Sequence, residues 1–78
     1  MKAQEKAKIK EIIEFLDKKR KQYFEYADRA EKDGKIDALN YNLGKSSGFA
    51  AAKIKLEDFL EEVEEQEKFV DDPEWLGK

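Results

Sequence analysis

The residues with the clearest chemical signature are Gly44, Lys45, Ser46 and Ser47, because GKS closes the Walker loop that binds phosphate groups. That loop has the pattern G-x-x-x-x-G-K-[ST] and follows a buried strand. Its first glycine would have to stand at position 39, which is Leu39, and nothing before it has the pattern of a buried strand. The sequence therefore argues against a Walker-type phosphate loop.

Two other interpretations of this stretch remain, a helix break and a helix contact. Gly44 and Gly48 each lower helix stability by about 1 kcal/mol relative to alanine, which favours a break. The apolar spacing nevertheless continues without a phase change from Tyr41 through Phe49 to Ala52. At about 100° per residue, small side chains would share one narrow strip, formed by Asn40, Gly44, Ser47, Gly48 and Ala51. Such a strip lets another helix approach closely, and we favour this interpretation.

Two cations in the middle of the chain are the best candidates for binding a ligand. Arg20 and Lys45 fall within apolar stripes, and the helix pairing described below brings them together. We expect no acidic residue in that region, and two desolvated cations call for an anion. Nearby tyrosines can stack on a base, while hydroxyl and amide groups can add hydrogen bonds. The candidate residues for a cyclic or other nucleotide are Arg20, Tyr23, Tyr26, Tyr41, Asn42, Lys45, Ser46 and Ser47. In the alternative interpretation, both cations lie at the helix edge and meet carboxylates of a second chain.

The residue types needed for several classes of catalysis are missing. The chain has no cysteine and no histidine. This excludes disulfides, thiolate or imidazole metal sites, and Cys–His or Ser–His nucleophiles. Glu61, Glu62, Glu64 and Glu65 are expected on a polar helix face, without a partner acid at a fixed separation. We therefore expect a protein that is not an enzyme and uses no cofactor or metal.

Two long helices would have to position the candidate residues. Residues 3–31 contain no glycine or proline and have apolar residues at steps of three and four. Asp33-Gly34 supplies a helix stop, and Asp37 is a candidate N-cap for a second helix over residues 37–68. The predicted fold class is all-α, an antiparallel two-helix hairpin that assembles into a helical homo-oligomer.

This hairpin is predicted as a single domain over residues 1–70, with a short tail over residues 71–78. In the tail, Asp72 precedes a proline and is a candidate cap for a last turn, and Trp75 either anchors the tail or docks a partner. Antiparallel pairing about Gly34 places residue i near residue 68−i. The predicted contacts are Ala27 with Tyr41, Leu16 with Ala52, Ile12 with Leu56, Ile9 with Phe59, Arg20 with Gly48 and Tyr23 with Lys45.

The second helix carries more apolar surface than one partner helix can cover. An aliphatic face is predicted roughly opposite the stripe formed by Tyr41, Gly48 and Ala52. Exposed apolar patches usually mark interfaces, so we expect self-association, with a dimer as the default. The predicted interface residues are Ile36, Leu39, Leu43, Gly44, Gly48, Ala50 and Ile54.

The net charge of −3 combines a basic beginning and an acidic end. Residues 1–21 carry +4, residues 22–56 carry +1 and residues 57–78 carry −8. Segments of opposite charge suit antiparallel packing. No overall basic field exists for duplex nucleic acid. No apolar run approaches the length of a membrane span and residues 1–16 lack a signal-peptide core, so we expect a cytoplasmic protein.

The stretch YNLGKSSGFAAAKIKLEDFL, after a Lys-rich helix and a DG turn, resembles small helical-hairpin proteins of bacteriophage and prophage genomes. In those proteins a Tyr-x-x-Gly-x-x-x-Gly run similarly precedes an Ala-rich helix, and the likeness covers about residues 5–65. Some small helical phage proteins are anti-CBASS sponges, oligomers that sequester cyclic nucleotides signalling infection. The resemblance implies a non-enzymatic anti-defence protein in the cytoplasm of an infected bacterial host. It transfers no site residue.

A second hypothesis of a different class remains open. In it, the chain is a helical dimer that docks on a host or phage protein and inhibits it through the face of Ile36, Leu39, Leu43, Ala50 and Ile54.

Overall fold

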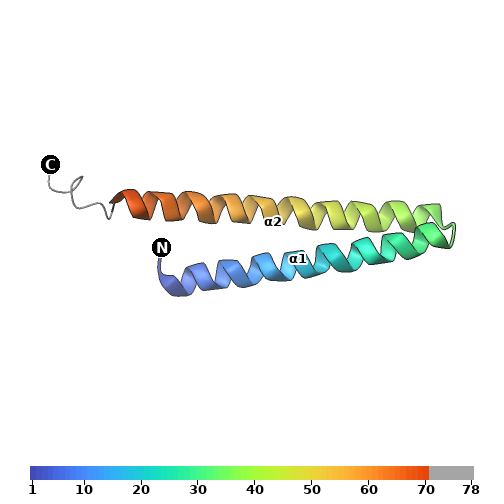
Figure 1. The fold of residues 1–78 in the computed structure, drawn as a ribbon, viewed down its shortest axis with the longest axis horizontal. Helices are drawn as coiled ribbons and strands as arrows, with labels where there is room; N and C mark the ends of the chain where they lie inside the picture. The colour runs from blue at the N-terminus through green and yellow to red at the C-terminus, as the bar shows by residue number, and fades with distance from the viewer. Residues whose placement is uncertain (71–78) are drawn as a thin grey trace.

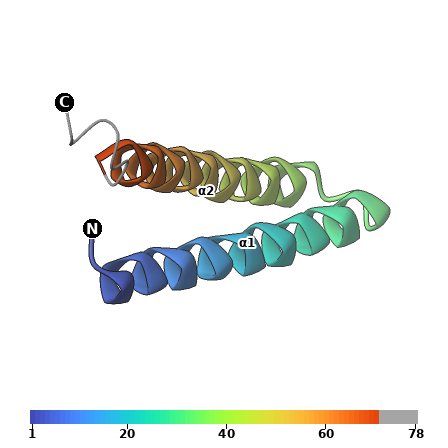
Figure 2. The same cartoon turned by 60° about the vertical axis from the view of Figure 1, so that its left-hand side comes forward.

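The computed structural model describes residues 1–70, with side chains up to Glu67. Two helices, α1 (Ala3–Lys32) and α2 (Ile36–Val70), lie side by side in opposite directions (Figures 1 and 2). The predicted all-helical hairpin is therefore confirmed. The predicted tail over residues 71–78, including Asp72 and Trp75, lies outside the described residues.

A three-residue connection between the helices reverses the chain. Gly34 has a positive φ of 72°, a conformation that a side chain disfavours. The Gly34 N–H donates to the carbonyl of Glu31 (3.1 Å), and the Lys35 N–H donates to the carbonyl of Ala30 (2.8 Å). These two bonds form a Schellman motif, which satisfies the last carbonyls of α1. The predicted stop at Gly34 is correct.

The predicted N-cap at Asp37 is wrong, because α2 begins one residue before it, at Ile36. The carbonyl of Lys35 accepts a bond from the Leu39 N–H (2.9 Å), so Lys35 precedes the first turn. Asp37 lies inside that turn. Its carboxylate is still favourably placed, because the amino end of a helix dipole attracts negative charge.

The surface where the helices meet, which we call the seam, follows a seven-residue repeat. Every seam residue is buried or half-buried, and the steps alternate between three and four on both helices, as in a coiled coil. In α1 the seam consists of Lys6, Ile9, Ile13, Leu16, Arg20, Tyr23, Ala27 and Ala30. In α2 it consists of Leu39, Asn42, Ser46, Phe49, Lys53, Leu56, Leu60, Val63 and Glu67.

The predicted facing stripe of α2 is right at Leu56, which lies in the seam, and wrong at Tyr41, Gly48 and Ala52. Tyr41, Gly48 and Ala52 are exposed, and Tyr41 keeps 61% of its surface accessible. Tyr23 stacks on Phe49 with ring centroids 5.6 Å apart, although the predicted partner was Lys45. The antiparallel direction is right, but α2 is rotated about its axis relative to the prediction. The rotation of α2 could not be predicted, because apolar residues lie on several sides of this helix and polar residues such as Asn42 lie in the seam.

The core of the hairpin is small. Among the described residues, the buried apolar side chains are Ala27, Ala30 and Leu60. Ten large hydrophobic residues remain exposed, namely Met1, Ile12, Phe15, Phe24, Tyr26, Ile36, Tyr41, Leu43, Ile54 and Phe59. All ten of these exposed residues lie outside the seam.

Candidate functional site

A cluster of charges around Asp17 lies beside the middle of the seam. The Asp17 carboxylate accepts hydrogen bonds from Arg20 (Nη2 at 3.0 Å) and pairs with Lys21 (3.1 Å) and Lys53 (3.2 Å). The bonds from Arg20, followed by those from Lys21 and Lys53, hold the pKa of Asp17 well below its usual range. Because Lys53 belongs to α2, this carboxylate links the two helices.

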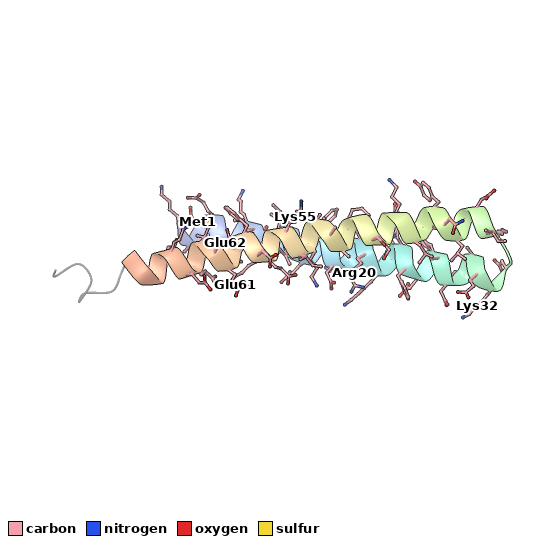
Figure 3. The ribbon with its side chains drawn as sticks, turned by 90° about the horizontal axis from the view of Figure 1, so that it is seen from above. Met1, Arg20, Lys32, Lys55, Glu61 and Glu62 are labelled. Carbon is pink, nitrogen blue, oxygen red and sulfur yellow. The ribbon has the colours of Figure 1, made fainter. Side chains whose placement is uncertain are left out.

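Asp17 corrects the prediction that no acidic residue lies at midspan. Arg20, labelled on α1 in Figure 3, already has an anionic partner three residues earlier in the chain. A carboxylate therefore offsets the cation that was expected to attract a ligand. The exposed Lys45 is not brought to Arg20, since it lies 5.5 Å from the ring of Tyr41, outside the seam.

Three more predicted ligand residues have structural roles in the seam. Ser46, only 7% exposed, donates from Oγ to the backbone carbonyl of Arg20 (3.0 Å), which holds α2 close to α1. Asn42 donates from Nδ2 to the carbonyl of Ala38 in its own helix (2.9 Å). Tyr23 packs against Phe49, as described above. Ser46 and Asn42 therefore each donate to a backbone carbonyl of the hairpin, and the Tyr23 ring packs between the helices.

Each side of the seam forms one surface shared by both helices. Phe24 and Asp28 of α1 line a shallow groove together with Leu39 and Leu43 of α2. Nearer the open end, residues of both helices line a second groove on the same side, namely Lys10, Ile13, Glu14, Glu57, Leu60, Glu61 and Glu64. The residues of α1 and α2 that lie on the other side of the seam must therefore share the opposite surface. We call these two surfaces the acidic flank and the basic flank.

The basic flank is aromatic and cationic. In α1 it consists of Lys8, Ile12, Phe15, Lys19, Gln22, Tyr26 and Arg29. In α2 it consists of Ala38, Tyr41, Lys45, Gly48, Ala52, Lys55 and Phe59. These rows contain five cations and no carboxylate, and only at the open end of the described helices do Glu5 and Glu62 follow.

Short-range contacts order the aromatic residues of this flank. Lys19 lies 5.6 Å from the centroid of Phe15 and 3.5 Å from Gln22 Oε1. Gln22 donates to Tyr26 Oη (2.8 Å), and the Tyr26 ring meets Tyr23 edge to face. A cation near an exposed aromatic ring gains about 0.5–1 kcal/mol. These pairs present flat rings beside positive charge.

The acidic flank combines carboxylates with aliphatic residues. In α1 it consists of Ala7, Lys10, Glu14, Asp17, Lys21, Phe24, Asp28 and Glu31. In α2 it consists of Ile36, Asn40, Leu43, Ser47, Ala50, Ile54, Glu57, Glu61 and Glu64. These rows carry seven carboxylates against two lysines. In Figure 3, Lys55 and Glu61 point to opposite sides of the hairpin.

The structure places the predicted ligand-binding and interface residues on different surfaces of the hairpin. Of the candidate ligand residues, Tyr26, Tyr41 and Lys45 share the basic flank, while Ser47 lies on the acidic flank and the remaining four lie in the seam. Of the candidate interface residues, four share the acidic flank, namely Ile36, Leu43, Ala50 and Ile54. The other three separate, with Leu39 in the seam, Gly48 on the basic flank, and Gly44 on the outer face, which points away from the seam.

Phe15 and Lys19 were not among the predicted ligand-binding residues. Their spacing could have indicated them, because positions 12, 15, 19, 22 and 26 of α1 repeat the three-and-four spacing of the seam. No helix in residues 1–70 has the length and apolar character needed to cross a membrane. No protein-family model, no curated protein and no solved structure matches this chain, so geometry and sequence alone bear on its function.

Proposed function

We propose that this protein is a non-enzymatic helical interaction module whose first partner is another copy of itself. The observation that supports this proposal is the large imbalance between exposed and buried apolar residues. Ten large hydrophobic side chains are exposed, whereas three apolar residues form the core of the described hairpin. Four of the exposed side chains, those of Phe24, Ile36, Leu43 and Ile54, share the acidic flank, and large exposed apolar patches usually mark an interface.

Energetic considerations support the same proposal. Apolar burial contributes about 25 cal/mol per Å², and a chain of this size buries too little surface to be more than marginally stable alone. A second copy that covers Leu43 and Ile54 would add burial without ordering further backbone. In this proposal, helical homo-oligomerisation completes the fold, and the assembled surface docks on a host or phage protein.

The proposal is tested by sedimentation velocity at micromolar concentration. We expect the unmodified protein to sediment as an oligomer, and the double variant Leu43→Asp/Ile54→Asp to sediment as a folded monomer. Ala51→Asp is the matched control, because Ala51 lies exposed on the outer face of α2 and should leave assembly unchanged. A helical, compact monomer of the unmodified protein would contradict the proposal.

A second candidate function is favoured by the exposed cation–aromatic pairs of the basic flank. In this candidate the oligomer is a phage-type anti-defence sponge that sequesters a nucleotide messenger in the cytoplasm of an infected bacterial host. Lys45 beside Tyr41 and Lys19 beside Phe15 would offer charge to a phosphate and a ring to a base. Arg20 and the seam residues have no part in this version of the site.

Thermal unfolding with added cyclic dinucleotides tests this second candidate. A ligand that binds only the folded state raises the unfolding temperature as its concentration increases. We expect Lys45→Ala to abolish the rise, and Lys18→Ala, on the outer face of α1, to retain it. If cyclic dinucleotides leave the unfolding temperature of the unmodified protein unchanged, the sponge hypothesis fails for this class of messenger.

A further inference from the structure

We infer that the copies assemble through unlike surfaces, with the basic flank of one hairpin packed against the acidic flank of the next. This inference rests on the self-association proposed above and specifies its geometry. It starts from the distribution of charge, which the antiparallel packing sorts across the seam. One flank carries five cations and no carboxylate over residues 8–59, and the other carries seven carboxylates and two lysines.

Pairing two identical flanks would be unfavourable. Two basic flanks placed face to face would bring ten cations together, including Lys19, Lys45 and Lys55 from each copy. Two acidic flanks would likewise oppose the clusters around Glu57 and Glu61. Like charges opposed across an interface disfavour that pairing, whereas opposite charges select a partner and its orientation.

The two flanks place opposite charges at the same level at two points when neighbouring hairpins point the same way. Near the open end, Lys55 lies at the same level as Glu57, two residues later in α2. Near the turn, Arg29 lies at the level of Asp28, which precedes it in α1. Opposite charges therefore meet on α2 near the open end and on α1 near the turn, whereas Lys8 and Lys19 come level with Lys10 and Lys21 on α1.

The middle of each flank supports close approach. On the basic flank the middle of α2 is Gly48 and Ala52, two small residues, and a Cβ added at Gly48 would enter open space. On the acidic flank the same level carries Ala50 and Ile54. A branched aliphatic side chain opposite small residues packs well, as ridges do in grooves between helices. Packing in this manner covers apolar residues of both flanks in one contact.

The available area suffices for a stable contact. The shared length of the helices is about 45 Å, two helices 8–10 Å apart present a flank roughly 18 Å wide, and the product of roughly 800 Å² per copy equals one side of a standard interface. Each copy then offers one basic and one acidic surface. Such a heterologous contact builds a closed ring or an open row.

A single-stranded nucleic acid is the other ligand class that suits a basic, aromatic surface. It would leave Phe24, Leu43 and Ile54 of the acidic flank uncovered, whereas a second copy covers both flanks at once. The observations therefore favour a second copy of this chain, and binding of a polyanion becomes an outcome of the test.

Charge-reversed variants, mixed in pairs, test the inference. One variant is Lys45→Glu/Lys55→Glu on the basic flank, and the other is Glu57→Lys/Glu61→Lys on the acidic flank. Because each variant alone places like charges opposite one another at the level of residues 55–61 in α2, each should sediment as a monomer with unchanged helix content by circular dichroism. An equimolar mixture should regain the sedimentation coefficient of an oligomer, because unlike flanks again meet. Asp58→Lys/Glu65→Lys on the outer face is the control, and it should assemble like the unmodified protein.

The outcomes separate this inference from the proposed function. If the unmodified protein assembles and either variant alone assembles equally well, the contact joins identical flanks or another surface, and the inference is wrong. A mixture that remains monomeric overturns it as well. If the unmodified protein is monomeric and single-stranded DNA binds it through Lys45 and Lys55, the basic flank binds a polyanion, and self-association itself fails.

Discussion

Replacing Gly44 or Gly48 with alanine should stabilise the isolated hairpin. Both glycines lie inside α2, and a Cβ built at either position meets no atom within 4 Å beyond its chain neighbours and the adjacent helix backbone. Neither has a positive φ, so alanine adds no backbone strain. Glycine lowers helix stability relative to alanine by about 1 kcal/mol. The expected gain in unfolding free energy is therefore about 1 kcal/mol for each variant.

This gain should raise the unfolding temperature by about 4–8 °C, the shift that 1 kcal/mol produces in a domain of this size. Thermal and urea unfolding followed by circular dichroism, at concentrations low enough to keep the chain monomeric, would measure it. Gly44 lies on the outer face, so its variant should show the same gain at every protein concentration. A loss of stability in Gly44→Ala would refute the reasoning, because it would mean that the position contacts something inside the hairpin.

Gly48 differs from Gly44 in one respect, since it lies on the basic flank. The same methyl group should stabilise the dilute hairpin and yet weaken association, because it would occupy space at Gly48 into which the neighbouring copy is proposed to pack. Sedimentation equilibrium should therefore show weaker assembly for Gly48→Ala and unchanged assembly for Gly44→Ala. Tighter or equal association of Gly48→Ala would remove the argument for close approach at this point.

Three further predictions concern contacts between the two helices of the dilute hairpin. Ala27→Leu should lower the unfolding free energy by about 1–3 kcal/mol through overpacking, since Ala27 is 2% exposed, while Ala51→Leu on the outer face should be nearly neutral in urea unfolding. Ser46→Ala should lower the unfolding free energy by about 0.5–1.5 kcal/mol, because it removes the hydrogen bond between the helices. Ser47→Ala, on the acidic flank, should leave the unfolding free energy unchanged. Equal effects of the two variants would contradict a stabilising role of this hydrogen bond. The lowered pKa of Asp17 means that its ionised form stabilises the hairpin above the unfolded-state pKa of about 4, and that this contribution disappears as the pH falls further through the folded-state pKa. Asp17→Asn should therefore flatten the loss of stability below about pH 4 in acid titrations followed by circular dichroism, and a slope identical to that of the unmodified protein would contradict this assignment.

Local features of the chain were sufficient to predict the elements of this fold. The helical spacing of α1 and the glycine at position 34 defined two helices and their reversal, because a residue with positive φ after basic residues ends a helix by local chemistry alone. The chain reversal then makes the helices antiparallel. None of these conclusions depends on which face of α2 meets α1.

The rotation of α2 could be decided only by the packed structure. A sequence pattern selects a contact face by its apolarity, yet α2 is apolar on several sides and places Asn42, Ser46 and Lys53 in the seam. These polar residues are tolerated because each finds a partner there, such as Asp17 for Lys53 and the carbonyl of Arg20 for Ser46. Such pairings across 26 or more residues cannot be recognised from local spacing.

The division of charge between the two flanks has the same origin. Counted along the chain, the charges form a gradient from a basic beginning to an acidic end, and this gradient is visible in the sequence alone. Once the seam is known, the same residues divide instead across the hairpin, with Lys45 and Lys55 on one side and Glu57 and Glu61 on the other. The composition of each surface therefore follows from how α2 is rotated about its axis, which is a property of the packed pair of helices.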